Sequence, residues 1–283
     1  YGEVFSVIFG FFARLAPTEL RVVNTSYCDR CLVACNPYGT GCINCHTCWL
    51  IADKGSRQFN VRPFAIGLIE QGDESSSRLA LVVAVLATVT FDGFKETPIW
   101  FDINSGLWPQ FYRVFGDTTS YVIDTAGLLF APVMFIVLFT FFSLLISWAS
   151  GSQMGITRLM SVFAYSLLPI AIAYHVAHFF TLLIIQGQLI VPLASDPFGY
   201  GWDLFGTADY RVNIGLIDAR FAWFLGVSAI VVGHIVAVYI AHVIALRVFH
   251  NRKEAIRSQY PMLGLMVIYT VVSLWILAQP MVE

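Results

Sequence analysis

The chain has 283 residues, of which 58% are hydrophobic and 12% are charged, and its mean hydropathy is +0.73. A soluble globular domain carries about 25% charged residues, so this chain has too few polar groups to cover a water-facing surface. A lipid bilayer is therefore the expected outer solvent. The formal net charge of −2 gives no basis for a nucleic-acid partner. Because the first residue is Tyr1 rather than Met, we expect a preceding segment in the full protein.

Residues 1–16 contain one short apolar stretch, Val4–Ala13, with a charged residue on each side. A helix needs roughly 20 apolar residues to cross a bilayer, and this stretch is too short. We therefore expect an interfacial helix in residues 1–16, or the end of a longer helix that begins before Tyr1. Residues 17–74 follow as a Cys-rich extramembrane loop.

Residues 75–283 hold five segments that are apolar enough to cross a bilayer as helices. They are Leu79–Phe91 extended by its flanking residues, Tyr121–Ser150, Thr157–Gln188, Ala219–Phe249 and Tyr260–Gln279. Pro169 inside the third segment predicts a kink. The sequence therefore predicts an all-α fold, a polytopic transmembrane helix bundle of about five spans that follows the N-terminal interfacial helix.

The distribution of Lys and Arg predicts the orientation, because cytoplasmic loops carry an excess of these residues. Five spans place residues 1–78, 151–156 and 250–259 on one side. Twelve of the 16 Lys and Arg residues fall on that side when helix ends are counted with the nearest side. We therefore expect the Cys-rich loop in the cytoplasm and the C-terminus outside.

A loop on the other side, residues 195–206, is rich in glycine and aromatic residues. Trp and Tyr concentrate at membrane–water interfaces. Two interpretations are open, a structured re-entrant or lid-like loop and an ordinary interfacial connection. Asp196 and Asp203 in this loop are additional candidate metal ligands.

All six cysteines lie close together, in the pattern Cys28-x2-Cys31-x3-Cys35-x6-Cys42-x2-Cys45-x2-Cys48. Such density in a chain otherwise without cysteine indicates a bound metal or a knot of disulfides. Two of the C-x2-C pairs have the spacing of a zinc ribbon. The last three cysteines match the first three ligands of a bacterial ferredoxin cluster, but Ala52 stands where the fourth ligand belongs.

Three interpretations of the cysteines are open. In the first, thiolates bind Zn or an iron–sulfur cluster. In the second, Cys42-Ile-Asn-Cys45-His46 is a c-type haem attachment site, with His46 as a candidate ligand. In the third, disulfides staple a loop outside the cell. A cytoplasmic location favours the first interpretation, because reducing conditions disfavour disulfides.

Ionisable residues at bilayer depth are costly and therefore indicate function. The candidates are Asp92 in the first span, His175 and His178 in the third, and His234 in the fourth. With a rise of ~1.5 Å per residue, Asp92 and His234 lie ~21 Å from the cytoplasmic ends of their helices and the other two ~27–31 Å. The four can therefore meet in the outer half of the membrane. His242 lies ~12 Å deeper than His234 and is a weaker candidate.

Three imidazoles and a carboxylate suit a transition metal such as Zn, Fe or Cu. Two facing imidazoles equally suit a haem. A third interpretation is that these histidines only form hydrogen bonds between helices. A metal with an open position would allow hydrolysis by a bound water, whereas a bis-histidine haem would carry electrons.

Several unusual motifs occur in order along the second part of the chain. They are Thr90-Phe-Asp-Gly93, Ala173-Tyr-His-Val-Ala-His178, the loop from Ser195 to Thr207, Val232-Gly-His234, Arg257-Ser-Gln-Tyr-Pro-Met262 and Leu274-Trp-Ile-Leu-Ala-Gln-Pro280. On these motifs, residues 62–283 resemble the fenitrothion hydrolases, a family of bacterial polytopic membrane proteins. The chain residues on family motif positions are Asp92, His175, His178, Asp196, Asp203, His234 and His242.

The resemblance implies a protein of the bacterial inner membrane with further helices upstream and an activity on organophosphate triesters. The Cys-rich segment departs from the family and favours a redox or assembly role. Our leading hypothesis is a metal-binding subunit of a larger complex with other membrane proteins. The alternatives are a metal-dependent phosphotriester hydrolase and a transporter or structural anchor. No G-x-S-x-G, P-loop or G-x-G-x-x-G motif is present.

Overall fold

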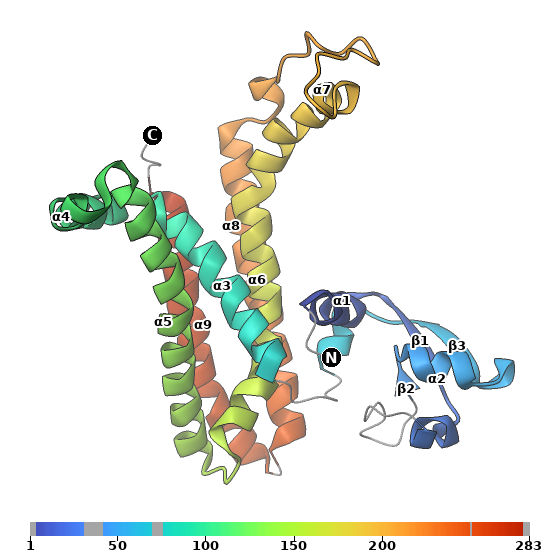
Figure 1. Ribbon diagram of the computed structural model, residues 1–283. Helices are drawn as coiled ribbons and strands as arrows, with labels where there is room; N and C mark the ends of the chain where they lie inside the picture. The colour runs from blue at the N-terminus through green and yellow to red at the C-terminus, as the bar shows by residue number, and fades with distance from the viewer. Residues whose placement is uncertain (1–3, 31–41, 70–75, 250, 280–283) are drawn as a thin grey trace. The chain divides into compact units, whose positions relative to one another are not determined.

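A computed structural model describes residues 4–30, 42–69, 76–249 and 251–279 of the chain, and Figure 1 shows its ribbon. The chain folds as two compact units. The first comprises Tyr1–Ala84, Phe135–Leu168 and Ala237–Gly264, and the second comprises Val85–Met134, Pro169–Val236 and Leu265–Glu283.

Within the described residues, five helical segments are long and apolar enough to cross a membrane. Their long helices are α3 (Ser76–Lys95), α5 (Thr119–Ser150), α6 (Ile156–Gln186), α8 (Ala219–Val248) and α9 (Arg252–Ala278). They confirm the prediction of an all-α polytopic bundle. The largest difference in bounds is at α9, which begins at Arg252 rather than at Tyr260. The first turns of α9 are charged, so hydropathy predicts only the apolar part of the helix, which begins at Tyr260.

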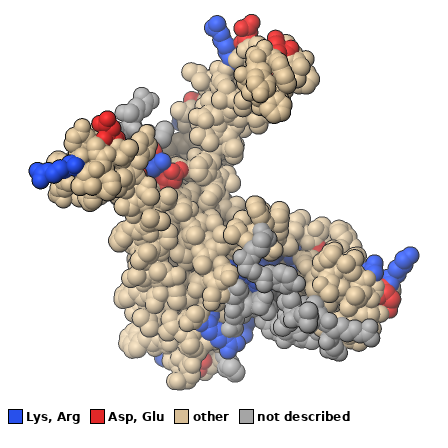
Figure 2. Space-filling model, in the orientation of Figure 1, with Lys and Arg blue, Asp and Glu red and all other residues tan. Residues whose placement is uncertain are grey.

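The surface of these helices fits a lipid surrounding. On the face that Figure 2 shows, the described Lys, Arg, Asp and Glu side chains gather near helix ends and in connections, and the surface along the helices is almost uncharged. Large apolar side chains of α5, such as Phe130, Val137 and Trp148, are exposed. A hydrocarbon solvent accommodates such side chains without cost.

Helix α4 (Pro98–Phe115) was not predicted, because its aromatic and polar residues indicated an interfacial loop. Its start has clear local causes. The Thr97 side chain accepts a hydrogen bond from the backbone N–H of Trp100 at 3.4 Å, and Pro98 occupies the first helical position, where no N–H is needed. A second short helix, α7 (Ile190–Ser195), precedes the glycine-rich loop.

The predicted Cys-rich loop contains a small antiparallel sheet in the order β2-β1-β3 (Figure 1). The strands are β1 (Thr18–Val22), β2 (Cys42–Ile43) and β3 (Arg57–Val61), and α2 (His46–Ile51) packs against β1. Thr18 pairs with Val61 and Arg21 with Ile43. Strands this short are fixed by their partners rather than by local pattern, so the loop prediction missed them.

A buried ion pair connects this sheet to helix α1 (Val4–Leu15). The carboxylate of Glu19 on β1 lies 3.0 Å from Nη1 of Arg62, and both side chains are almost fully buried. Arg62 also donates to the backbone oxygen of Ala13, near the end of α1, at 2.7 Å. Charge-assisted hydrogen bonds of this kind fix geometry strongly.

Helix α1 has one buried and one exposed apolar face. Phe11 is buried, and its ring centre lies 6.1 Å from that of Tyr165 on α6. Val4, Phe5 and Phe9 are each more than half exposed. The prediction of a helix is confirmed, and its location at the membrane interface stays a prediction.

Glycine allows a close approach of α6 and α8 in the second unit. A Cβ at Gly233 of α8 would collide with Cβ of Ala173 and would lie 3.0 Å from the carbonyl oxygen of Pro169. In a bilayer the hydrophobic effect does not drive helices together. Small residues at a helix crossing instead allow the backbones to approach closely, and the resulting van der Waals packing stabilises the pair.

We expect Gly233→Ala to destabilise the protein by about 1–3 kcal/mol, because the new methyl group would push the two helices apart. Gly106→Ala on α4 is the matched control, because nothing lies within 4 Å of a Cβ at that position. The apparent melting temperature of each variant, measured by size-exclusion chromatography in detergent after heating, checks this expectation. Equal melting temperatures for the two variants would contradict the close approach.

Candidate functional site

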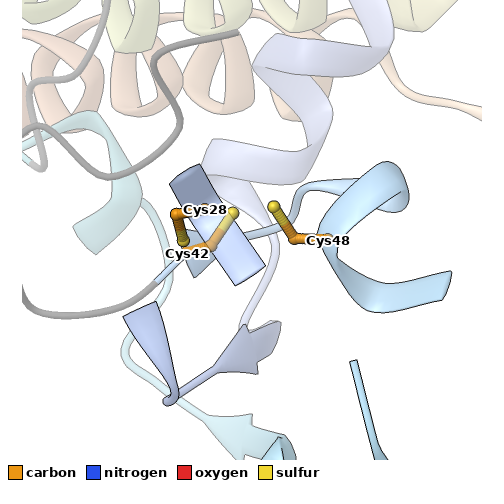
Figure 3. Close-up of side chains that lie close together, drawn as sticks. All are labelled: Cys28, Cys42 and Cys48. Carbon is orange, nitrogen blue, oxygen red and sulfur yellow. The ribbon is translucent and has the colours of Figure 1, made fainter. Parts of the chain in front are cut away.

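Three cysteines from separate elements meet in the first unit. The Sγ atoms of Cys28, Cys42 and Cys48 all lie within 4.8 Å of one another (Figure 3). Cys28 belongs to a 3₁₀ turn at Thr25–Arg30, Cys42 to β2 and Cys48 to α2. Among the described residues, this is the group of three or more His, Cys, Asp or Glu side chains that is able to hold a metal ion.

The thiol cluster is also the core of the small module. Cys42 is 1% exposed and Cys48 is 0% exposed, and they pack with Val22 and Ala52. Cys28, Cys45, Tyr27 and Trp49 are partly buried against this core. Two of the four fully buried residues are therefore potential metal ligands.

The remaining predicted cysteine ligands differ in their location. Cys45 stands directly before α2 and packs against the cluster, but it is outside the group of three. Cys31 and Cys35 lie outside the described residues. His46 is exposed at the start of α2. No disulfide joins Cys28, Cys42, Cys45 and Cys48 to one another.

Tyr27 and Asp53 position the cluster, and neither residue was predicted, because no cysteine motif includes them. The Tyr27 hydroxyl donates to Oδ2 of Asp53 at 2.8 Å, and the backbone N–H of Ser56 donates to Oδ1 at 2.8 Å. The backbone oxygen of Tyr27 accepts a weak hydrogen bond from Sγ of Cys48 at 3.9 Å. The hydrogen bonds from Tyr27 and Ser56 lower the pKa of Asp53 below its ordinary value of 3.8.

In the second unit, Asp92 and His178 form a direct pair. Nε2 of His178 donates to Oδ2 of Asp92 at 2.7 Å, and Nζ of Lys95 lies 3.0 Å from Oδ1 of the same carboxylate. With the proton on Nε2, Nδ1 of His178 keeps its lone pair. A carboxylate that orients a histidine in this way is the usual support of a metal ligand or a base. Lys95 was missed, although its place three residues after Asp92 puts both on one helix face.

His175 and His234 are oriented in a similar way, by their own helices. Nδ1 of each ring donates at 2.8 Å to a backbone oxygen four residues earlier, that of Ala171 or Ile230. Nε2 of His234 is buried and has no hydrogen-bond partner in the described part of the chain. Within the described residues, no three of Asp92, His175, His178 and His234 bring candidate ligand atoms within 4.8 Å of one another.

A small cavity of about 90 Å³ lies beside the Asp92–His178 pair, in the second unit. Gly93, Tyr174, His178 and Ser273 contribute to its lining. Ser273 is fully buried. The cavity is large enough for a few water molecules, which each occupy about 30 Å³.

The weaker candidate ligands have other hydrogen-bond partners. Nδ1 of His242 donates to Oε1 of Gln259 at 2.7 Å, within the first unit. Asp196 accepts the backbone N–H groups of Tyr200 and Gly201. Asp203 accepts hydrogen bonds from the backbone N–H groups of Thr207, at 2.6 Å, and Ala208, at 3.0 Å. The two carboxylates of the 195–206 loop therefore stabilise its turns.

These features define the class of the molecule, an integral membrane protein with a cysteine cluster that is able to hold a metal ion. No known protein family, curated protein or solved structure matches the chain. The resemblance to the fenitrothion hydrolases stays a prediction.

The lowered pKa of Asp53 leads to a pH prediction. A group with a lowered pKa contributes stability above its ordinary pKa and loses it as the pH falls through the folded value. We therefore expect the Tyr27–Asp53 contact to persist at neutral pH and to be lost only as the pH falls through the lowered pKa of Asp53, below 3.8. Cys48 should then react faster with dithiodipyridine in metal-free protein, as mass spectrometry of its peptide would show.

In Asp53→Ala, the contact is absent at every pH. The ratio of its Cys48 reaction rate to that of the wild type should exceed one at neutral pH and should fall toward one as the pH is lowered through the pKa of Asp53, below 3.8. Lys54→Ala is the control, because this neighbouring residue belongs to the same turn without contributing to the Asp53 hydrogen bonds. A rate ratio for Asp53→Ala that does not change with pH would contradict the assignment.

Proposed function

We propose that this protein is a metal-binding subunit of a larger membrane complex, with a redox or assembly role, and that its cysteine module binds one thiophilic transition-metal ion. The observation that supports the proposal most directly is the approach of three Sγ atoms from three separate elements to within 4.8 Å. Zn and iron are the metals that such a thiolate set prefers.

The spacing of the thiols fits a metal centre. In a tetrahedral site with metal–sulfur bonds of about 2.3 Å, neighbouring sulfurs lie about 3.8 Å apart. The observed upper limit of 4.8 Å requires only small side-chain movements to reach that spacing. Cys45, which packs against the cluster, is the nearest described source of a fourth thiolate.

The burial of the thiols also favours a bound cation. A thiolate buried in apolar surroundings is costly unless a positive charge compensates it. Cys42 and Cys48 are both fully buried, so a metal ion would supply that compensation. Small domains with few buried residues commonly need a bound metal or another cross-link for stability, and four of the described residues form the buried core of this module.

Metal analysis of cysteine variants tests the proposal. We expect the detergent-purified protein to hold about one metal ion per chain by mass spectrometry, and Cys28→Ser, Cys42→Ser and Cys48→Ser each to lower its affinity at least ~100-fold, because each removes a thiolate ligand. An absorption spectrum distinguishes colourless Zn from an iron–sulfur centre.

Cys45→Ser is the informative comparison, because it removes a thiol that lies outside the group of three. A loss equal to that of the other variants assigns Cys45 as the fourth ligand. Ser26→Ala is the matched control, because it changes the same 3₁₀ turn as Cys28 without a thiol. Wild-type protein without metal, or retention of metal by all three ligand variants, would contradict the proposal.

Hydrolysis of phosphate triesters is a second candidate function. The resemblance to the fenitrothion hydrolases suggests it, and the Asp92–His178 hydrogen bond of 2.7 Å favours it, because a carboxylate-oriented imidazole is a suitable base or metal ligand. The adjacent cavity of about 90 Å³ is smaller than the roughly 300–1,000 Å³ of typical ligand sites. A triester would therefore require the cavity to widen.

A chromogenic phosphotriester assay on vesicle-reconstituted protein tests this second function. If it is correct, His178→Gln and Asp92→Asn should each lower kcat/KM by about 10²–10⁴, the usual contribution of an acid–base group. Asp102→Asn is the control, because Asp102 is exposed on α4 and contributes neither to the Asp92–His178 pair nor to the lining of this cavity. Unchanged turnover in His178→Gln would exclude this use of the pair.

A further inference from the structure

A second and larger cavity, of about 560 Å³, lies in the second unit where α3 ends and α5 begins. Its volume is within the range of small-molecule sites, roughly 300–1,000 Å³. Neither the thiol cluster nor the Asp92–His178 pair contributes a side chain to it. Its lining combines indole rings, carboxylates and one ammonium group, from Lys95, Glu96, Trp100, Asn104, Trp108 and Asp124.

The charges in this cavity do not balance. Nζ of Lys95 lies 3.0 Å from Asp92 and 3.7 Å from Glu96. Lys95 carries the one ammonium group among the described lining residues. Its charge is shared between Asp92, which lies outside the lining, and the lining carboxylates Glu96 and Asp124. Glu96 and Asp124 together bring more negative charge than Lys95 neutralises, so the cavity favours a cation.

Asp124 is held in place by neutral donors. Its Oδ1 accepts Nε1–H of Trp100 at 2.8 Å and Nδ2–H of Asn104 at 3.2 Å. These bonds fix the carboxylate and one indole together without cancelling the charge. The second oxygen, Oδ2, has no hydrogen-bond partner in the described part of the chain and stays available as an acceptor.

The aromatic rings of the lining suit an organic cation. Trp100 and Trp108 both belong to α4, and Trp108 also stacks on Tyr112, with ring centres 5.6 Å apart. Tryptophan faces attract ammonium groups that lie within about 6 Å, and aromatic rings are the usual recognition surface for quaternary ammonium. A small metal cation would make no use of these rings.

The location favours a ligand that reaches a membrane boundary. Lys95 is the last residue of α3, and Thr119 begins α5, so the cavity adjoins the ends of two apolar helices that can span a membrane. Exposed apolar side chains of α4, including Ile99 and Phe101, adjoin the lining indoles. The apolar side chains of α4 can therefore contact the acyl chains of a lipid whose polar headgroup lies in the cavity.

We propose that this cavity binds an organic ammonium group, supplied either by the headgroup of an ethanolamine or choline phospholipid or by a small amine in the aqueous phase. The carboxylate of Asp124 pairs with the cation, and the faces of Trp100 and Trp108 enclose it. This inference is independent of metal binding at the cysteines.

Calorimetric titration with choline chloride, against potassium chloride at equal ionic strength, tests the aqueous source. The protein is used full length in a neutral maltoside detergent. We expect choline to bind and Asp124→Asn to weaken it about tenfold or more, because the variant removes the charge and keeps an oxygen for Trp100. Asp102→Asn is the matched control on α4, because Asp102 is exposed and is absent from the cavity lining.

Native mass spectrometry of protein released from mixed-lipid nanodiscs tests the membrane source. Retention of ethanolamine and choline lipids over phosphatidylglycerol, lost in Asp124→Asn, supports the headgroup as ligand. Choline binding with the same loss supports the aqueous amine. If Asp124→Asn does not fold, Glu96→Gln, which changes a half-exposed side chain, should weaken binding in the same assay. No preference for ammonium in either assay, or an equal loss in Asp102→Asn, overturns the proposal.

Discussion

A lipid bilayer offers no hydrogen bonds, and most of this chain is organised by that constraint. An unsatisfied backbone group in hydrocarbon costs several kcal/mol, so an apolar segment must satisfy its own backbone as a helix. Side-chain hydroxyls in the spans follow the same rule. Thr140 and Ser143 of α5 both donate at 2.7 Å to backbone oxygens four residues earlier. The helices can therefore carry hydroxyls without needing polar partners from outside.

The lack of hydrogen-bonding groups in the bilayer also explains which polar side chains indicate a functional site. Asp92 is compensated from two directions, by Lys95 at 3.0 Å and by His178 at 2.7 Å, so it is stable as an anion between helices. Nε2 of His234 is buried without a hydrogen-bond partner among the described residues. A buried polar group without a partner is costly and rare, so this atom is a position where a water molecule or ligand would stabilise the fold.

The long helices were predictable, because hydropathy is a local property and the bilayer leaves apolar segments few alternatives. The sheet, α4 and the partners of the cysteines were not. Spacing alone suggested pairs of ligands within C-x2-C motifs. Among the described cysteines, the structure brings together Cys28, Cys42 and Cys48 from three elements, a grouping that spacing did not predict. That grouping depends on β2 pairing with β1 and on α2 packing beside it. Such contacts join residues distant in sequence, which no local pattern determines.

The small sheet module connects stability to metal chemistry. Protonated thiols pack as small apolar groups, so Cys42 and Cys48 can close the core with Val22 and Ala52 in the absence of metal. Four buried residues contribute little, since fully burying a side chain of medium size is worth only about 1.5–3 kcal/mol. Deprotonation of the thiols would weaken that core unless a cation entered with it. Metal loading or thiol oxidation should therefore change the stability of the whole module, a property that an assembly or redox subunit can use.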